Sequence, residues 1–156
     1  MKTLKNVLLT AVPTAVCAIA GSVITALNLD YPQTLKLPSY YPPGWLFAVV
    51  WTAVFILIVI ASTVALTNAK SRAEKENALF VFNIQLIFNL LWSVCFFSLK
   101  MPWLAFGEIV LLLAVIAVMT VEYGKIKRLC AYLLIPYIVW VAFAAFFLNL
   151  PIAIMN

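Results

Sequence analysis

Five apolar stretches, each about 20 residues long, occupy most of this chain of 156 residues. Hydrophobic residues make up 67% of the sequence and charged residues 10%, a balance that excludes a soluble globular domain. About 20 residues of helix cross roughly 30 Å of hydrocarbon, and the sequence lacks the ten-residue alternation of a membrane barrel. We therefore predict an all-α integral membrane protein. Its single domain, residues 1–156, is a five-transmembrane-helix bundle with spans at about 6–27, 44–67, 79–98, 102–122 and 129–149.

The basic residues are sorted between the two sides of the predicted bundle. If the spans alternate in direction, eight basic residues fall on the side of the N-terminus and two, Lys36 and Lys100, on the other. Short cytoplasmic loops carry an excess of Lys and Arg, so we predict a cytoplasmic membrane protein with its N-terminus inside and its first loop outside. The same sorting argues against a nucleic-acid partner despite the net charge of +5.

A secretory signal peptide is the alternative interpretation of residues 1–20. Lys2 and Lys5 precede an apolar run, and Ala18-Ile19-Ala20 has the form of a cleavage site. Against this alternative, the apolar run continues to Leu27, which is long enough to span a bilayer. Cleavage would also undo the sorting of the basic residues.

The composition gives no indication of a metal centre or a required cofactor. Histidine is absent, and the three cysteines have no metal-ligand spacing. We therefore read the cysteines as small apolar packing residues.

The first connection, from Asn28 to Pro43, is unusually rich in proline and tyrosine. It holds four of the eight prolines and three of the six tyrosines. Pro42 and Pro43 fix φ and keep the preceding backbone extended, so the next helix begins after them. We predict that this connection folds over the outer end of the bundle as a capping loop. An aromatic belt stiffened by proline is the alternative.

Aromatic and amide side chains recur at helical spacing in three spans. They are Phe47, Trp51 and Phe55 in the second span, Phe82, Gln85, Asn89, Trp92 and Phe96 in the third, and Tyr137, Trp140, Ala144 and Phe147 in the fifth. An amide in hydrocarbon must find a hydrogen bond, so the face of the third span looks into the bundle. Whether the two amides join helices or contact a ligand stays open.

Depth separates the five tryptophans into two groups. Trp45 and Trp103 stand at the outer ends of their helices, which is typical of interfacial anchors. Trp51, Trp92 and Trp140 lie several residues further in, on the order of 10 Å below the outer surface. We therefore predict a pocket lined by aromatic rings beneath the first loop.

Glu108 is the one carboxylate well inside an apolar span. An intramembrane carboxylate is a functional candidate by default. Because Glu108 lies about one and a half turns from the outer end of its helix, access to water is the alternative.

A series of motifs in this order resembles the TspO, or translocator protein, family, also called tryptophan-rich sensory proteins and peripheral-type benzodiazepine receptors. The motifs are Pro42-Pro43-Gly44-Trp45-Leu46-Phe47, Val50-Trp51-Thr52, Asn89-Leu90-Leu91-Trp92-Ser93 and Leu134-Ile135-Pro136-Tyr137-Ile138-Val139-Trp140. The resemblance implies a five-helix membrane bundle, often a homodimer, whose first loop caps a pocket for porphyrins. Sterols and benzodiazepine-like drugs are ligands of some members.

The resemblance also implies roles for individual residues, with some departures from the family pattern. Trp51 and Trp140 match the pocket tryptophans of the family, and one extra residue separates Trp140 from Asn149. Val49 stands where proline is usual and Glu108 where aspartate is usual. The predicted ligand-binding residues are Tyr31, Pro42, Trp45, Phe47, Trp51, Phe55, Gln85, Asn89, Trp92, Trp103, Tyr137, Trp140 and Ala144.

Three functions are compatible with the sequence. The first is a receptor, sensor or carrier in the lipid bilayer that binds porphyrins, such as protoporphyrin IX, and similar flat apolar molecules. The second is an enzyme that degrades porphyrin in light through Trp51 and Trp140, which the resemblance alone implies. The third is a helix-bundle scaffold whose aromatic residues only pack. In the first two, porphyrin is the ligand or the substrate and no cofactor is required.

Overall fold

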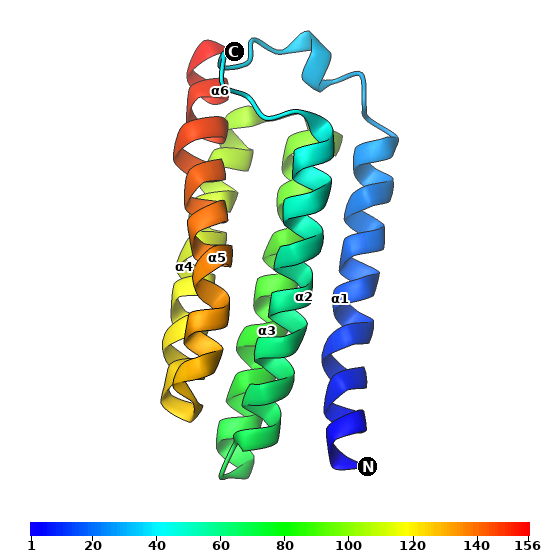
Figure 1. Ribbon diagram of the computed structural model, residues 1–156. Coiled ribbons are helices and arrows are strands. Elements are labelled where there is room, and N and C mark those ends of the chain that lie inside the picture. The colour runs from blue at the N-terminus through cyan, green and yellow to red at the C-terminus, as the bar shows by residue number, and fades with distance from the viewer.

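Five long helices form an upright bundle in the computed structural model, which describes residues 1–156 (Figure 1). The helices are α1 (Lys2–Ala26), α2 (Gly44–Asn68), α3 (Arg72–Ser93) continued by η2 (Val94–Ser98), α4 (Pro102–Ile126), and α5 (Arg128–Phe143) continued by η3 (Ala144–Asn149) and α6 (Leu150–Met155). A short 3-10 turn, η1 (Pro32–Thr34), lies in the first connection. No strand is present, and each of the five helices is long and apolar enough to cross a membrane. The predicted fold class is confirmed.

The helices extend beyond the apolar runs from which they were predicted. The fifth run was expected to end near residue 149, but helical turns continue to Met155. These last turns are still apolar, and they bury Ile152 and Ala153 beneath the first connection. Burial therefore carries the fifth helix past its predicted end.

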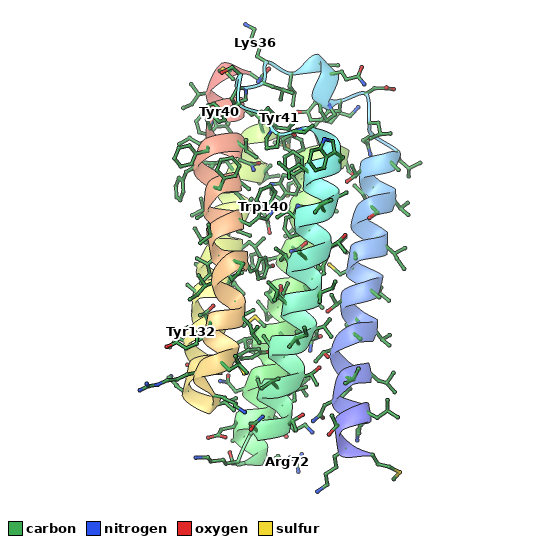
Figure 2. All side chains as sticks on the ribbon, in the orientation of Figure 1. Lys36, Tyr40, Tyr41, Arg72, Tyr132 and Trp140 are labelled. Atoms are coloured by element: carbon green, nitrogen blue, oxygen red, sulfur yellow. The ribbon has the colours of Figure 1, made fainter.

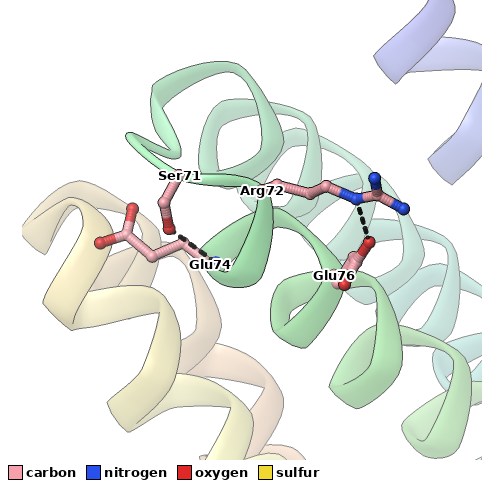
Figure 3. A network of polar contacts seen from close by, with 4 residues as sticks. All are labelled: Ser71, Arg72, Glu74 and Glu76. Atoms are coloured by element: carbon pink, nitrogen blue, oxygen red, sulfur yellow. Dashed lines mark hydrogen bonds and ion pairs between the residues drawn. The ribbon is translucent and has the colours of Figure 1, made fainter.

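The start of α3 shows how a helix extends outside the apolar run. The side chain of Ser71 accepts a hydrogen bond from the backbone N–H of Glu74 at 3.1 Å, which caps the helix, and Arg72 pairs with Glu76 one turn further on at 2.6 Å (Figure 3). Both charged side chains of the pair are largely exposed, so the pair contributes little stability. The cap instead sets where the connection from α2 ends.

The eight basic residues that the sequence places on one side gather at one end of the bundle. They lie at the start of α1, at the turn that joins α2 to α3 and at the turn that joins α4 to α5, including the adjoining helix ends. These residues are Lys2, Lys5, Lys70, Arg72, Lys75, Lys125, Lys127 and Arg128. We call this the basic end. The opposite end, where the first connection crosses the bundle beside α6, is the lid end (Figure 1).

Polar contacts fix α1 to its neighbours near the basic end. Asn6 donates to the Thr67 hydroxyl at 3.2 Å and accepts from the Lys75 ammonium at 3.1 Å. One turn further along, the hydroxyls of Thr10 and Thr63 lie 2.8 Å apart. Because apolar burial gives little attraction between helices in lipid, such hydrogen bonds help to hold α1 against α2 and α3.

Small residues bring α2 close to the other helices. Ala61, Ser62 and Ala65 are fully buried along one face of α2. Tyr123 of α4 reaches this face and donates its hydroxyl to Ser62 at 3.0 Å. Close backbone approach through small residues is how membrane helices gain van der Waals contact.

Candidate functional site

The first connection packs down onto the lid end as the sequence predicts. We call residues 28–43 the lid. Four of its side chains pack against a buried cluster that includes Phe96 and Ile152, and they are Tyr31, Leu35, Leu37 and Tyr41. The lid is apolar on its inner side, so it covers the ends of the helices.

A reciprocal pair of hydrogen bonds joins the lid to the C-terminal turns. The backbone N–H of Lys36 donates to Asn156 Oδ1 at 2.9 Å, and Asn156 Nδ2 donates back to the Lys36 carbonyl at 3.0 Å. These bonds are exposed, so each contributes modestly. They fix the middle of the lid over α6.

Two tyrosines of the lid reach the aromatic residues below it. Tyr31 meets Phe96 edge to face with ring centroids 5.7 Å apart, and Tyr41 meets Phe47 at 5.4 Å. Tyr41 lies at the lid end and lines the cavity below the lid (Figure 2). Burial raises the pKa of both phenols above the ordinary value, so both are neutral near pH 7.

A cavity of about 30 Å³ lies under the lid, enclosed by helices from every part of the bundle except α1. Its wall is almost entirely apolar, with five aromatic rings. The lining residues are Tyr41, Phe47, Trp51, Trp92, Phe96, Ile109, Ala144, Leu148, Asn149 and Ile152. A small, partly open cavity with an aromatic wall therefore lies where the sequence predicts the pocket.

Two polar side chains of the cavity wall, Trp92 and Asn149, are hydrogen-bonded within the wall. Trp92 donates its indole N–H to Asn149 Oδ1 at 3.0 Å, and Asn149 donates its amide to the Ala144 carbonyl at 2.9 Å. The Trp92 ring stacks on Phe96 with centroids 5.2 Å apart and planes 15° from parallel. The wall consequently presents ring faces and edges to the interior.

The π-helical segment η3 accounts for the extra residue between Trp140 and Asn149. A π turn accommodates one residue more than an α turn, and η3 spans Ala144–Asn149. Both end residues of the segment line the cavity, Ala144 at its start and Asn149 at its end. The wider turn therefore keeps both residues on the same face.

A buried hydrogen-bond network lies one turn below the cavity wall. Tyr137 is fully buried; its hydroxyl donates to Gln85 Oε1 at 2.8 Å and accepts from Asn89 Nδ2 at 2.9 Å. The sequence left open whether the two amides join helices or contact a ligand. In this structure both amides bind Tyr137, and they join α3 to α5.

The two matched pocket tryptophans occupy different positions. Trp51 lines the cavity, where its ring lies 5.6 Å from Phe55 and 6.4 Å from Tyr137. Trp140 does not line the cavity, but its ring centroid lies 5.5 Å from that of the lining residue Phe47. The indole N–H of Trp140 is buried and has no hydrogen-bond partner.

The structure places three of the other predicted site residues away from the cavity. Trp45 and Trp103 are 68% and 59% exposed, at the outward faces of α2 and α4 near the lid end. This is the position of interfacial anchors, because an amphipathic ring favours the membrane surface. Phe55 lines a separate groove of about 340 Å³ between α1 and α2. Pro42 is buried in the lid and does not line the cavity.

Glu108 does not reach water. Its side chain is 5% exposed, and neither carboxyl oxygen has a hydrogen-bond partner. It lies in α4 beside Ile109, which lines the cavity, but Glu108 itself is outside the lining. The interpretation that this carboxylate is solvated through the membrane surface is therefore wrong.

Several lining residues were absent from the predicted set. Tyr41 and Phe96 carried a detectable signal, since one lies in the tyrosine-rich lid and the other shares the helix face of Trp92. The other three, Ile109, Leu148 and Ile152, carried no signal. Aliphatic residues of a membrane span occur both toward lipid and toward the interior, so the sequence does not distinguish the two positions.

Comparison with known proteins agrees with this arrangement. A model of the TspO/MBR family matches residues 9–154. The chain belongs to the TspO/MBR family. The matched residues include the five helices' apolar cores, the lid and every residue that lines the cavity. Family membership supports a role as a membrane sensor or receptor.

Relatives in the TspO/MBR family are similar over most of their lengths. The tryptophan-rich protein TspO of Chlorobaculum tepidum is 36% identical over 138 residues, which covers 88% of this chain and 87% of the relative. The protein of the same name from Archaeoglobus fulgidus is 34% identical, with 88% of each chain covered. The human translocator protein is 27% identical over 86% of this chain and 80% of its own.

Proposed function

We propose that this protein is a membrane receptor, sensor or carrier that binds porphyrins, such as protoporphyrin IX, and similar flat apolar molecules under the lid. The observation that carries the proposal is the cavity under the lid, whose wall contains five aromatic rings. Flat conjugated ligands gain offset and edge-to-face contacts from such rings in addition to apolar burial. The polar atoms of Trp92 and Asn149 are already hydrogen-bonded within the wall. Shape and ring stacking therefore dominate recognition in the part of the cavity that these residues line.

Ligand binding requires the cavity to open. Sites for drug-sized ligands typically hold about 300 to 1,000 Å³, whereas this cavity holds about 30 Å³. The lid is the element best suited to move. It is held by exposed hydrogen bonds to Asn156 and by ring contacts of Tyr31 and Tyr41, and exposed contacts of this kind open at low free energy. We infer that Tyr41 leaves the cavity as the lid lifts.

We further propose the orientation and assembly of the protein. The basic end faces the cytoplasm and the lid faces the outside of the cytoplasmic membrane, because cytoplasmic connections carry the excess of Lys and Arg. The protein forms a homodimer, as the family resemblance implies. Cross-linking in native membranes tests the dimer, which fails if only monomer is recovered.

Titration of the purified protein with protoporphyrin IX, followed by tryptophan fluorescence, tests the proposed binding. We expect saturable quenching, since Trp51 and Trp92 line the cavity. Ala144→Leu places a larger side chain in the cavity and should weaken binding, while Ala114→Leu on the same bundle is the control, since Ala114 does not line it. Quenching that never saturates, or that Ala144→Leu leaves unchanged, would contradict the proposal.

Porphyrin degradation in light is the second candidate function. The observation that favours it is the indole ring of Trp51 in the cavity wall, where an oxidisable group would touch a bound porphyrin. Trp140, the other predicted redox residue, lies 5.5 Å from the lining residue Phe47. Illumination of the complex should then yield a defined product over several turnovers. Product formation that is the same without protein would exclude this candidate.

A further inference from the structure

Lys100 occupies a backbone position that usually belongs to glycine. It follows η2 with φ of 55°, and it is the one residue other than glycine with positive φ. The turn closes through hydrogen bonds from Leu99 N–H to the Val94 carbonyl at 2.9 Å and from Met101 N–H to the Cys95 carbonyl at 3.2 Å. Glycine adopts this left-handed helix end without steric strain. The turn itself does not need the lysine side chain.

The Lys100 side chain contacts the lid instead of an acidic residue. Its Nζ lies 5.7 Å from the centroid of the Tyr31 ring, within cation–π range. The two ion pairs of the chain involve other residues, Arg72 with Glu76 and Lys125 with Glu122. Because the Tyr31 phenol is neutral, the ammonium has no anionic partner there.

Two rings, those of Tyr31 and Phe96, connect this ammonium to the cavity. Tyr31 packs edge to face on Phe96 at 5.7 Å, and Phe96 both lines the cavity and stacks on Trp92 at 5.2 Å. Lifting the lid removes Tyr31 and exposes the Lys100 ammonium beside Phe96, which stays in place because it belongs to η2. The acidic residue of the lid, Asp30, forms no ion pair with it.

Lys36 is the other basic residue at the lid end, and it differs from Lys100 in its setting. Its backbone joins Asn156, while its side chain extends away from the bundle (Figure 2). A substitution at Lys36 therefore removes one positive charge from the same end of the protein without changing the lid contacts. This makes Lys36 a matched control.

We propose that Lys100 is the recognition group for a carboxylate carried by the ligand, and that its ammonium exchanges the Tyr31 ring for this carboxylate when the lid opens. The inference rests on the proposed function, and it specifies the ligand class as flat apolar rings that bear an acidic substituent at one edge. A charge-assisted hydrogen bond is stronger than an exposed cation–π contact, so the exchange favours the bound state. Loss of the Tyr31 contact also couples carboxylate recognition to lid opening.

The test compares protoporphyrin IX, which has two carboxylates, with its dimethyl ester, which has none. Affinities for both are measured by tryptophan quenching on the wild type, Lys100→Gln and Lys36→Gln. We expect Lys100→Gln to lose about tenfold in affinity for the diacid, the order expected for one charge-assisted hydrogen bond. The affinity of Lys100→Gln for the diester should equal that of the wild type or be slightly higher. Lys36→Gln should bind both compounds with the affinity of the wild type.

A second variant separates recognition from a structural role. Lys100→Gly fits the left-handed backbone better than lysine does, so its apparent Tm should equal or exceed that of the wild type. It should nevertheless lose the preference for the diacid as Lys100→Gln does.

Equal affinities for diacid and diester in every variant would overturn the role of Lys100 while leaving the proposed function intact. A similar loss of diacid affinity in Lys36→Gln would also overturn it, because a general surface charge would then be responsible. If neither compound binds the wild type, the proposed function itself fails.

Discussion

Removing the hydroxyl of Tyr137 should destabilise the bundle while leaving the cavity nearly intact. Tyr137→Phe keeps the fully buried ring but removes both hydrogen bonds, to Gln85 at 2.8 Å and from Asn89 at 2.9 Å. Hydrogen bonds between membrane helices average about 0.6 kcal/mol each. A buried amide left without a partner adds about 1 to 3 kcal/mol, and Gln85 Nε2 already lacks one.

These terms give a loss of about 2 to 4 kcal/mol in the free energy of unfolding. For a chain of this size the loss corresponds to a fall of about 4 to 16 °C in apparent Tm. Thermal unfolding in detergent, followed by tryptophan fluorescence, measures it. Tyr132→Phe is the matched control, because it removes the same atom from a residue of α5 that is 63% exposed and points away from the bundle (Figure 2).

A double-mutant cycle checks the cause of the loss. Gln85→Leu removes the acceptor, so adding it to Tyr137→Phe should destabilise less than the sum of the two single substitutions. Porphyrin affinity should change less than threefold in Tyr137→Phe, since the ring contact with Trp51 remains. If Tyr137→Phe and Tyr132→Phe have the same Tm, the network does not stabilise the bundle and the reasoning is refuted.

Three further predictions concern the cavity, the lid and the orientation. Trp51→Ala should weaken porphyrin binding about tenfold, because the ligand loses contact area and stacking. Trp45→Ala, which removes an outward indole, should leave the dissociation constant unchanged. Equal effects of the two substitutions in a fluorescence or absorbance titration would place the site elsewhere. Tyr41→Ala should speed ligand dissociation severalfold in stopped-flow measurements, because Tyr41 closes the cavity from the lid; an unchanged off-rate would show that the lid does not gate release. In intact cells an impermeant thiol reagent should label the Gln33→Cys variant and leave the Lys2→Cys variant unlabelled. The three native cysteines do not interfere because they are buried. The reverse labelling pattern would invert the proposed orientation.

The sequence alone determined the class, the number of helices and the location of the lid. Hydrophobic length decides whether a segment crosses the bilayer, and this is a local property that needs no partner. The depth of Trp51 and Trp92 was readable for the same reason, because rise per residue converts position in a span into distance from the surface. The outward anchoring of Trp45 and Trp103 at the helix ends also followed from depth.

The tertiary structure decided which faces meet at the cavity. Helical periodicity relates residues of one helix to one another, but the rotation of each helix about its axis depends on packing with all its neighbours. This is why Trp51 lines the cavity while Trp140 contacts Phe47 without lining it, and why Ile109 and Ile152 belong to the wall without any signal in the sequence. The π turn of η3 likewise sets the rotation of Asn149 toward Trp92, because one added residue in a turn rotates all later side chains unless the helix widens to absorb it.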